Sequence, residues 1–400
     1  MIQNQKNVVG SDPYVLYDQL SGYYYCYTTS EDWKDKEQAF YIYKSLDLVN
    51  WEFVGYALDL KDKNTWGKDW YWAPECYYNP NNDYYYLFYS ARVKTKLVEK
   101  YFGDPQYLES CRIGVAVSKS PEGPFVNISD EPLDYYPFDE DYLSICDVSN
   151  NVFELNDAQL LENAPKGKYI PIIDVNLLFD DNRIFMYFSR CCYMNCKYDE
   201  KYKKFIEESN VAGVELDTDW WYDKEAKIMP KIKKQYQGYD SISNRRKDKF
   251  ITLISYEKEQ QEWENKHIND YEIFNKTRRN RRWAEGSTTF IMNINDTKKY
   301  CITYSCNYFI GKYYGVGIAF SDKPLEDYKK YEYNPIIVQN EEESIFSTGH
   351  GSVVYYNNEL YYFLHGRDKI NNPRILYVTK LKIENNKVSH TELIKCNLIK

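Results

Sequence analysis

Five polar residues stand at the start of five similar aromatic-rich stretches of the chain: Asp12, Glu75, Asp174, Glu285 and His350. Each precedes a short apolar run, where an unpartnered buried charge would be costly. Carboxyl and imidazole groups are the side chains that most often move protons in hydrolysis. Taken singly, each could equally be a turn or cap residue. Their role therefore depends on whether the fold brings them together.

The stretches that begin at these residues share one pattern, in which a short apolar strand is followed by a turn of Asn, Asp or Gly and then an aromatic strand. They cover residues 11–30, 73–92, 173–190, 284–306 and 348–367. Each one predicts a β-hairpin. Further strand pairs are predicted at 39–58, 112–128, 314–331 and 374–388, with a looser continuation of the third hairpin at 211–221.

Two hairpins per repeat make the four strands of one propeller blade, so the sequence predicts an all-β, five-bladed β-propeller in which residues 1–400 form a single domain. A β-sandwich would also contain alternating strands and turns, but the repeated double hairpin favours the propeller. The innermost strands of a propeller line its axis and run in the same direction. The five polar residues are therefore expected to meet at one end of the axis.

Long connections separate the repeats at residues 92–111, 127–170 and about 193–283. The last is charged, and residues 254–267 have a helical pattern. We expect a partly helical insert here, between blades 3 and 4. Such inserts usually lie on a rim, where loops shape a substrate pocket.

Crowded carboxyl groups repel one another, so their pKa values separate and one group stays ionised while another keeps a proton near neutral pH. Glycoside hydrolysis needs this pair of states, because an acid protonates the leaving oxygen while a base activates water. In the inverting arrangement the two carboxyls stand roughly 6.5–9.5 Å apart, and a third carboxylate can orient the acid.

Composition limits the other possibilities. The net charge of −9 is not the footprint of a nucleic-acid-binding protein, and the basic group at 278–282 is interpreted as a solvated loop or an ion-pair partner. The sequence has no apolar run of membrane-spanning length and no signal peptide at its start, which predicts a cytoplasmic protein, the alternative being a secreted protein whose leader has been removed. The 10 cysteines lack zinc-ligand spacing and are expected to be buried thiols. The 44 tyrosines favour strands.

Six motifs occur in the order in which glycoside hydrolase family 43 has them, and the chain resembles that family over nearly its whole length. The motifs are GSDPYVL with Asp12, SLDLVNW with Trp51, WAPE with Trp72 and Glu75, IDVNLLFDD with Asp174, AEGS with Glu285, and TGHGS with His350. Two departures are that Val175 follows Asp174 and that Glu75 stands where Asp is commoner.

The resemblance implies an inverting enzyme in which Asp12 is the general base and Glu285 the general acid. Asp174 would tune the pKa of Glu285 and hold its orientation. No cofactor would be required, although in some members of the family the histidine corresponding to His350 binds a calcium ion or water near the axis. His350 is therefore the candidate metal ligand.

Five residues are candidates for substrate binding. Arg367 would reach sugar hydroxyls, and the aromatic faces of Trp33 and Trp72 would wall a sugar subsite. The candidates are Trp33, Trp72, Glu75, His350 and Arg367.

The expected substrate is an oligosaccharide of plant hemicellulose, from which a β-xylosidase or α-L-arabinofuranosidase would remove xylose or arabinose. The alternatives are an endo-arabinanase, a related fructan-cleaving enzyme and a non-catalytic carbohydrate-binding propeller. The fructan enzyme is disfavoured because Ser11-Asp12-Pro13-Tyr14 stands where such enzymes have Asn-Asp-Pro-Asn-Gly. No nucleic acid or membrane partner is expected, and the oligomeric state is open.

Overall fold

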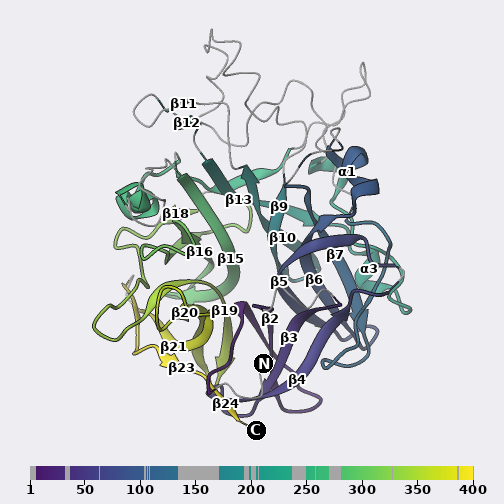
Figure 1. The fold of residues 1–400 in the computed structure, drawn as a ribbon, viewed down its shortest axis with the longest axis horizontal. Helices are drawn as coiled ribbons and strands as arrows, with labels where there is room; N and C mark the ends of the chain where they lie inside the picture. Colours follow the sequence, from purple (N-terminus) through teal and green to yellow (C-terminus); the bar gives the residue numbers. More distant parts are fainter. Residues whose placement is uncertain are drawn as a thin grey trace.

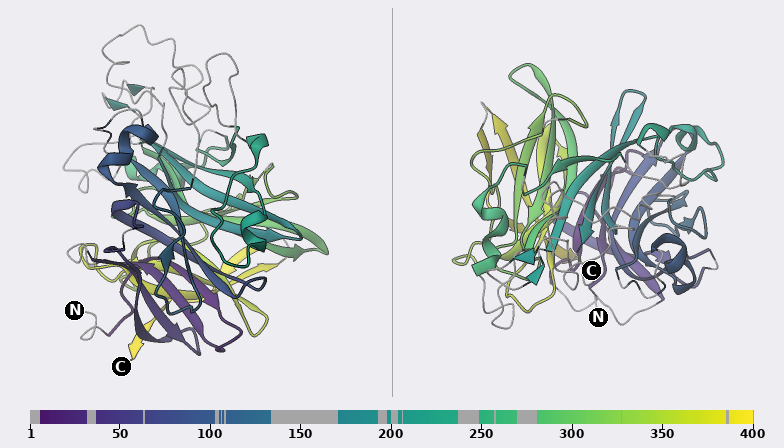
Figure 2. Two further views of the ribbon diagram at one scale, coloured as in Figure 1. Left: turned by 90° about the vertical axis from the view of Figure 1, so that its right-hand side faces the viewer. Right: turned by 90° about the horizontal axis from the view of Figure 1, so that it is seen from above.

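The computed structural model describes residues 6–31, 37–133, 171–192, 198–199, 204–205, 207–236, 249–269 and 281–399, except 63, 103–104, 106, 108, 257, 327 and 385–386. Its strands form five twisted, mainly antiparallel blades around one centre, two of which are joined into one sheet (Figures 1 and 2). Each blade corresponds to one predicted repeat, so the chain is the expected five-bladed β-propeller.

Blades 1 and 2 each contain four consecutive strands. Blade 1 comprises β1 (Ser11–Tyr17), β2 (Tyr24–Thr29), β3 (Gln38–Ser45) and β4 (Asn50–Asp59). Blade 2 comprises β5 (Gly67–Asn79), β6 (Tyr84–Val93), β7 (Cys111–Ser118) and β8 (Val126–Asn127), with α1 (Thr95–Phe102) between β6 and β7. The first strand of each blade is innermost.

Blades 3 and 4 are joined into one sheet, because β13 and β15 pair in parallel. Blade 3 comprises β9 (Ile172–Asp180), β10 (Arg183–Cys192), β13 (Glu207–Leu216) and β14 (Ile251–Ile254). Blade 4 comprises β15 (Arg281–Ile294), β16 (Thr297–Cys306), β17 (Gly315–Ser321) and β18 (Lys329–Lys330).

The region expected to be an insert therefore supplies two strands of blade 3. Short elements lie around these strands: β11 (Tyr198–Asp199), β12 (Lys204–Phe205), α3 (Asp219–Tyr222), η3 (Lys234–Tyr236) and η4 (Glu262–Asn269). The helix predicted at 254–267 is only partly right, because Ile254 ends a strand and the helical turns, of 3₁₀ type, begin at Glu262. Most of the connection at 127–170 lies outside the described residues.

Blade 5 closes the ring with the help of both termini. It comprises β19 (Phe346–Tyr356), β20 (Glu359–Arg367), β21 (Ile375–Glu384), β22 (Lys387–His390) and β23 (Ile394–Lys395). The final strand, β24 (Asn397–Ile399), crosses to blade 1 and pairs in parallel with β4. The Val8 N–H donates to the Cys396 carbonyl and the Leu376 N–H to the Val8 carbonyl, so the two ends lie side by side (Figure 1).

The core lies between neighbouring blades, which pack face to face. Strand β2, for instance, is buried along its whole length. Aromatic residues fill these interfaces, as where Trp51 of blade 1 meets the edge of Phe363 of blade 5. The cysteines that the structure describes are all buried, as expected. No helix among the described residues is long and apolar enough to cross a membrane.

Candidate active site

A backbone irregularity recurs in the innermost strand of every blade and positions the site. The strand pairing shifts register beside each of the five predicted polar positions, as at a β-bulge. A residue there adopts a left-handed conformation, with φ of 53° at Asp12, 50° at Ala73, 56° at Asp174, 58° at Gly286 and 42° at His350. Bulges redirect side chains away from the regular alternation, and left-handed backbone in non-glycine residues costs free energy that functional sites tolerate.

The backbone N–H groups freed by these bulges are taken up by side chains. In three blades the acceptor lies on the second strand of the preceding blade. The Asp12 N–H donates to His365 Nδ1 (3.1 Å), the Ala73 N–H to Thr29 Oγ1 (2.8 Å) and the His350 N–H to Ser305 Oγ (2.7 Å). In blade 4 the Gly286 N–H donates to Asp174 Oδ2 (3.1 Å). These four bulges are thus each held by the neighbouring blade.

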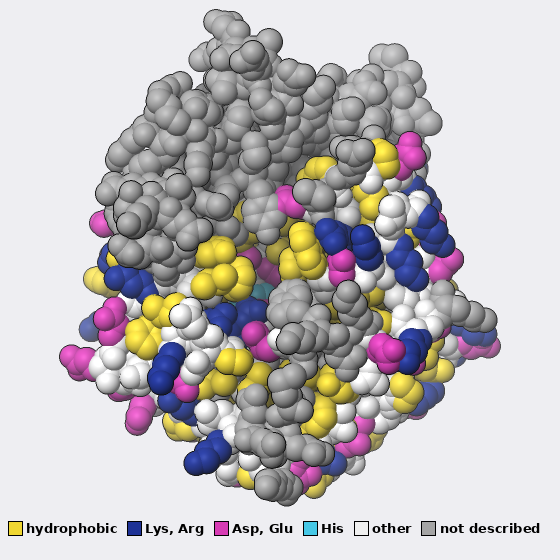
Figure 3. Space-filling view, viewed as in Figure 1, with side chains coloured by type: hydrophobic (Ala, Val, Ile, Leu, Met, Phe, Trp, Pro, Cys, Tyr) yellow, Lys and Arg dark blue, Asp and Glu magenta, His cyan; other side chains and the backbone are white. Residues whose placement is uncertain are grey.

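The redirected side chains meet in one pocket to which all five blades contribute. Its empty volume is about 580 Å³, part of it open to solvent. Figure 3 shows the hollow at the centre of this face, with charged side chains in its depth and hydrophobic ones around it. The lining residues are Asp12, Trp72, Ile173, Asp174, Trp283, Glu285, Phe309, Tyr314, His350 and Arg374. The predicted acid, base and third carboxyl are therefore together.

Asp12 lies among groups that favour its ionised form. Its Oδ1 is 3.3 Å from His350 Nδ1, 3.4 Å from His365 Nδ1 and 3.6 Å from Arg374 Nη1. Burial alone would raise the pKa of Asp12, but His350 and Arg374 hold that pKa well below its usual range. Burial lowers the pKa of His365 to about 3, so its ring is neutral. Asp12 is therefore ionised at any physiological pH.

Asp174 has the opposite environment. Burial, together with the negative charges of Glu285 and Asp12, raises the pKa of Asp174 from 3.8 to about 7, although His350 and the Gly286 N–H act against this. Its Oδ2 also accepts a hydrogen bond from Ser189 Oγ at 3.2 Å. Asp174 therefore keeps its proton up to near neutral pH.

Glu285 accepts hydrogen bonds at both carboxyl oxygens. Trp283 Nε1 donates to Oε2 at 2.6 Å, and Tyr314 Oη donates to Oε1 at 2.9 Å. Trp283 lies two residues before Glu285 on β15, so the two-residue period of a strand places both side chains on the same face. Tyr314 comes from the loop before β17.

Aromatic and apolar side chains form one wall of the pocket. Trp72, Trp283 and Ile173 belong to one small hydrophobic cluster. The Trp72 ring stacks on that of Trp70, with 5.2 Å between centroids and 15° between planes. The guanidinium of Arg92 lies over the Trp70 ring, 4.3 Å from its centroid. Trp72 is therefore held flat, as a sugar-stacking residue must be.

His350 lines the pocket as predicted, but its surroundings do not fit the calcium ion that the resemblance offered. Calcium prefers six to eight oxygen ligands, whereas the His350 ring faces a carboxylate already shared with Arg374. Among the described residues, no group of three or more His, Cys, Asp and Glu side chains could hold a metal ion.

Two predicted substrate-binding residues, Glu75 and Arg367, are not among the residues that line the pocket. Glu75 is buried, with its carboxyl accepting a hydrogen bond from Tyr77, and burial raises its pKa well above the usual range. Arg367 donates to the Asn372 carbonyl. Trp33 lies outside the described residues.

The arginine that lines the pocket is Arg374. Its Nε donates to Glu31 Oε1 at 2.6 Å, and its guanidinium lies 5.2 Å from the Phe309 ring centroid. Sequence reasoning missed Tyr314 and Arg374 because they begin the second strand pairs of their repeats, whereas the predicted candidates lie in or beside the first hairpins. It missed Phe309 because this residue lies in a connection between strand pairs. Trp283 could have been found from its spacing to Glu285.

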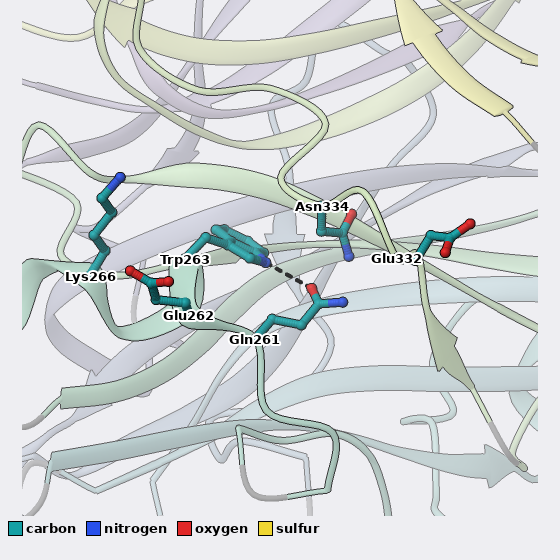
Figure 4. Close-up of a pocket in the computed structure, with 6 residues that line it drawn as sticks. All are labelled: Gln261, Glu262, Trp263, Lys266, Glu332 and Asn334. Carbon is teal, nitrogen blue, oxygen red and sulfur yellow. Dashed lines mark hydrogen bonds between the residues drawn. The ribbon is translucent and has the colours of Figure 1, made fainter.

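Another groove lies on the outer side of blade 4, between η4 and the loop after β18 (Figure 4). Its indole, Trp263, is buried and donates Nε1–H to Gln261 Oε1 at 2.8 Å. The charged groups that line it, Glu262, Lys266 and Glu332, have mixed sign. The groove has no feature comparable with the carboxyl cluster of the axial pocket.

Comparison with known proteins agrees with this geometry. Residues 6–143 match the model of glycosyl hydrolases family 43. An endo-1,4-beta-xylanase from Bacteroides thetaiotaomicron VPI-5482 shares the fold with a TM-score of 0.63 and 23% identity, over 98% of each chain. An alpha-L-arabinofuranosidase from Lactobacillus brevis does so with a TM-score of 0.58 and 14% identity, over 97% of this chain and 94% of that one. No curated protein sequence matched. The first third of the chain thus matches glycosyl hydrolases family 43, and the whole chain has the same fold as these two enzymes.

Proposed function

We propose that this glycoside hydrolase removes single xylose or arabinose residues from hemicellulose oligosaccharides with inversion at the anomeric carbon. The observation that carries the proposal is the pocket itself, in which Asp12, Asp174 and Glu285 converge beside a flat tryptophan. The solved structures of the same fold include a xylan beta-1,4-xylosidase and an alpha-L-arabinofuranosidase, which supports the choice of pentose.

In the proposed reaction Asp12 accepts a proton from water, whose oxygen bonds to the anomeric carbon. Glu285 gives a proton to the glycosidic oxygen, which leaves with the electron pair of the broken bond. The ionised state of Asp12 suits the base. Asp174, which keeps a proton near neutral pH, lies in the same pocket as the proposed acid, Glu285.

The pocket residues divide into a face for the sugar ring and a set for its hydroxyls. Trp72 offers an aromatic face to the sugar's C–H groups. Arg374 is fixed by Glu31 and offers donors to hydroxyls, which makes it a better candidate than Arg367. The pocket is partly open to solvent, as the entry of a sugar unit requires.

The test is turnover of 4-nitrophenyl β-xyloside, 4-nitrophenyl α-L-arabinofuranoside, xylobiose and arabinobiose, with the anomer of the first product read by NMR. We expect release of one of the two pentoses in the inverted configuration, and loss of turnover in Asp12→Asn with sugar binding retained. Glu215→Gln, which changes a buried carboxyl outside the pocket, is the matched control. No turnover of these substrates, or a retained configuration, would contradict the proposal.

A further inference from the structure

The two oxygens of Glu285 have chemically different partners. Oε2 accepts from the indole N–H of Trp283, and Oε1 accepts from the hydroxyl of Tyr314. An indole nitrogen can only donate, whereas a tyrosine hydroxyl can donate or accept. The two oxygens are therefore not equivalent as carriers of a proton.

The short bond to Trp283, at 2.6 Å, favours one position for the proton of a neutral Glu285. In a carboxylic acid the carbonyl oxygen is a strong acceptor and the hydroxyl oxygen a weak one. The oxygen that faces Trp283 is therefore the carbonyl oxygen, and the proton is on Oε1. This is the oxygen that Tyr314 contacts.

The ring of Tyr314 is immobile, although its hydroxyl hydrogen can turn. The ring is 1% exposed and stacks on His365, with 5.8 Å between centroids and 11° between planes. It also lies against Gly349, where a Cβ atom would be 2.1 Å from Tyr314 Cε1. Burial and the neighbouring Glu285 carboxylate raise the pKa of Tyr314 well above its usual range, so the hydroxyl stays protonated.

We propose that Trp283 and Tyr314 are the positioning residues of the acid. Trp283 favours the proton on Oε1, and Tyr314 donates a hydrogen bond to Oε1 once that proton has been transferred. The Oε1–H bond breaks as the glycosidic oxygen gains the proton, and Glu285 becomes a carboxylate. The Tyr314 hydroxyl then donates to the newly charged Oε1, so this hydrogen bond strengthens along the reaction.

This inference rests on the proposed function, in which Glu285 is the acid. It makes Tyr314 important only where the leaving group needs a proton. A 4-nitrophenolate leaves without one, whereas the sugar leaving group of xylobiose or arabinobiose does not.

The experiment compares Tyr314→Phe with wild type on the aryl glycoside and on the disaccharide of the sugar that the enzyme accepts. Loss of a hydrogen bond to a charged group should lower kcat on the disaccharide by roughly 10- to 100-fold, with kcat on the aryl glycoside within about threefold and KM little changed. Tyr304→Phe is the matched control, because its buried hydroxyl donates to Glu264, away from the pocket. Its kcat on both substrates should equal that of wild type.

Trp283→Phe gives a second test that does not depend on the folding of Tyr314→Phe, and it should show the same preferential loss on the disaccharide. Equal losses of kcat on both substrates, or no loss on either, would overturn the inference, because Trp283 and Tyr314 would then serve only in packing. Glu285→Gln separates this from failure of the proposed function. If Glu285→Gln shows the preferential loss and the other two variants do not, only the positioning role fails. If Glu285→Gln does not show it, the acid assignment itself fails.

Discussion

Replacing Asp174 by asparagine should stabilise the protein at alkaline pH while impairing its activity. The carboxyl group is buried, and ionising it near Glu285 and Asp12 is costly, which is why its pKa is raised to about 7. Asparagine has nearly the same shape, and its amide oxygen can accept the hydrogen bond of the Gly286 N–H. The substitution therefore removes the cost of the charge with little change in packing.

The size of the effect follows from the displacement of the pKa. One pKa unit corresponds to about 1.4 kcal/mol, so a change from 3.8 to about 7 corresponds to about 4 kcal/mol. A carboxyl whose pKa is raised by folding adds stability when it is protonated, and this stability is lost as the pH rises through 7. The advantage of Asp174→Asn should thus be largest above pH 7. It should shrink by up to about 1.4 kcal/mol per pH unit between pH 7 and 4.

The assay is urea unfolding of the wild type and Asp174→Asn at each pH unit from 4 to 8. Glu215→Gln is a control of opposite sign. The hydrogen bonds of Arg183 and Lys233 to Glu215 lower its pKa, so its charge stabilises the fold above pH 4.5. Glu215→Gln should therefore be less stable than wild type at pH 7, with a difference that fades as the pH falls below 4.5. A difference between Asp174→Asn and wild type that stays constant with pH would refute the reasoning about Asp174.

Three further outcomes are expected. In the pH–rate profile, kcat/KM for the disaccharide should fall as the pH rises through about 7, because Asp174 then loses its proton. A constant value from pH 6 to 9 would speak against this. In steady-state kinetics, Arg374→Met should raise KM for the preferred glycoside at least tenfold, which is about the effect of losing one hydrogen bond to a charged group. An unchanged KM would show that Arg374 does not bind the sugar. In denaturant unfolding, Lys330→Met should lower the free energy of unfolding by about 3–5 kcal/mol, because it leaves the buried carboxylate of Glu264 unpaired. A loss below about 1 kcal/mol, which is typical of exposed ion pairs, would show that this pair contributes little.

The blades were predictable because each repeat is a local pattern. Hydrophobic alternation and turn residues specify a hairpin within about twenty residues, and identical hairpins imply a common axis. The convergence of Asp12, Asp174 and Glu285 followed from that symmetry alone. Strand β14 was not predictable, since only four residues form it and a long connection separates them from their partner, β13.

The lining of the pocket was only partly predictable, because loops do not follow the repeat. Arg367 ends a strand and was the natural choice, yet it bonds to Asn372 within its own loop. Arg374, just after that loop, contacts Glu31 of blade 1 and lines the pocket instead. The conformation of residues 368–373 decides which of the two arginines faces the axis, and amino-acid composition does not determine that conformation. Tyr314 was one of 44 tyrosines and carried no local signal.

The backbone N–H groups at the bulges are hydrogen-bonded by neighbouring blades. The proposed catalytic site therefore needs the complete ring of five blades. Asp12, the proposed general base, is encoded near the start of the chain, but the imidazole that fixes its backbone, His365, is translated some 350 residues later. A nascent or truncated polypeptide without the last blade would carry the base without the contact that fixes it. Maturation of the catalytic centre must therefore wait for the final hairpins to dock.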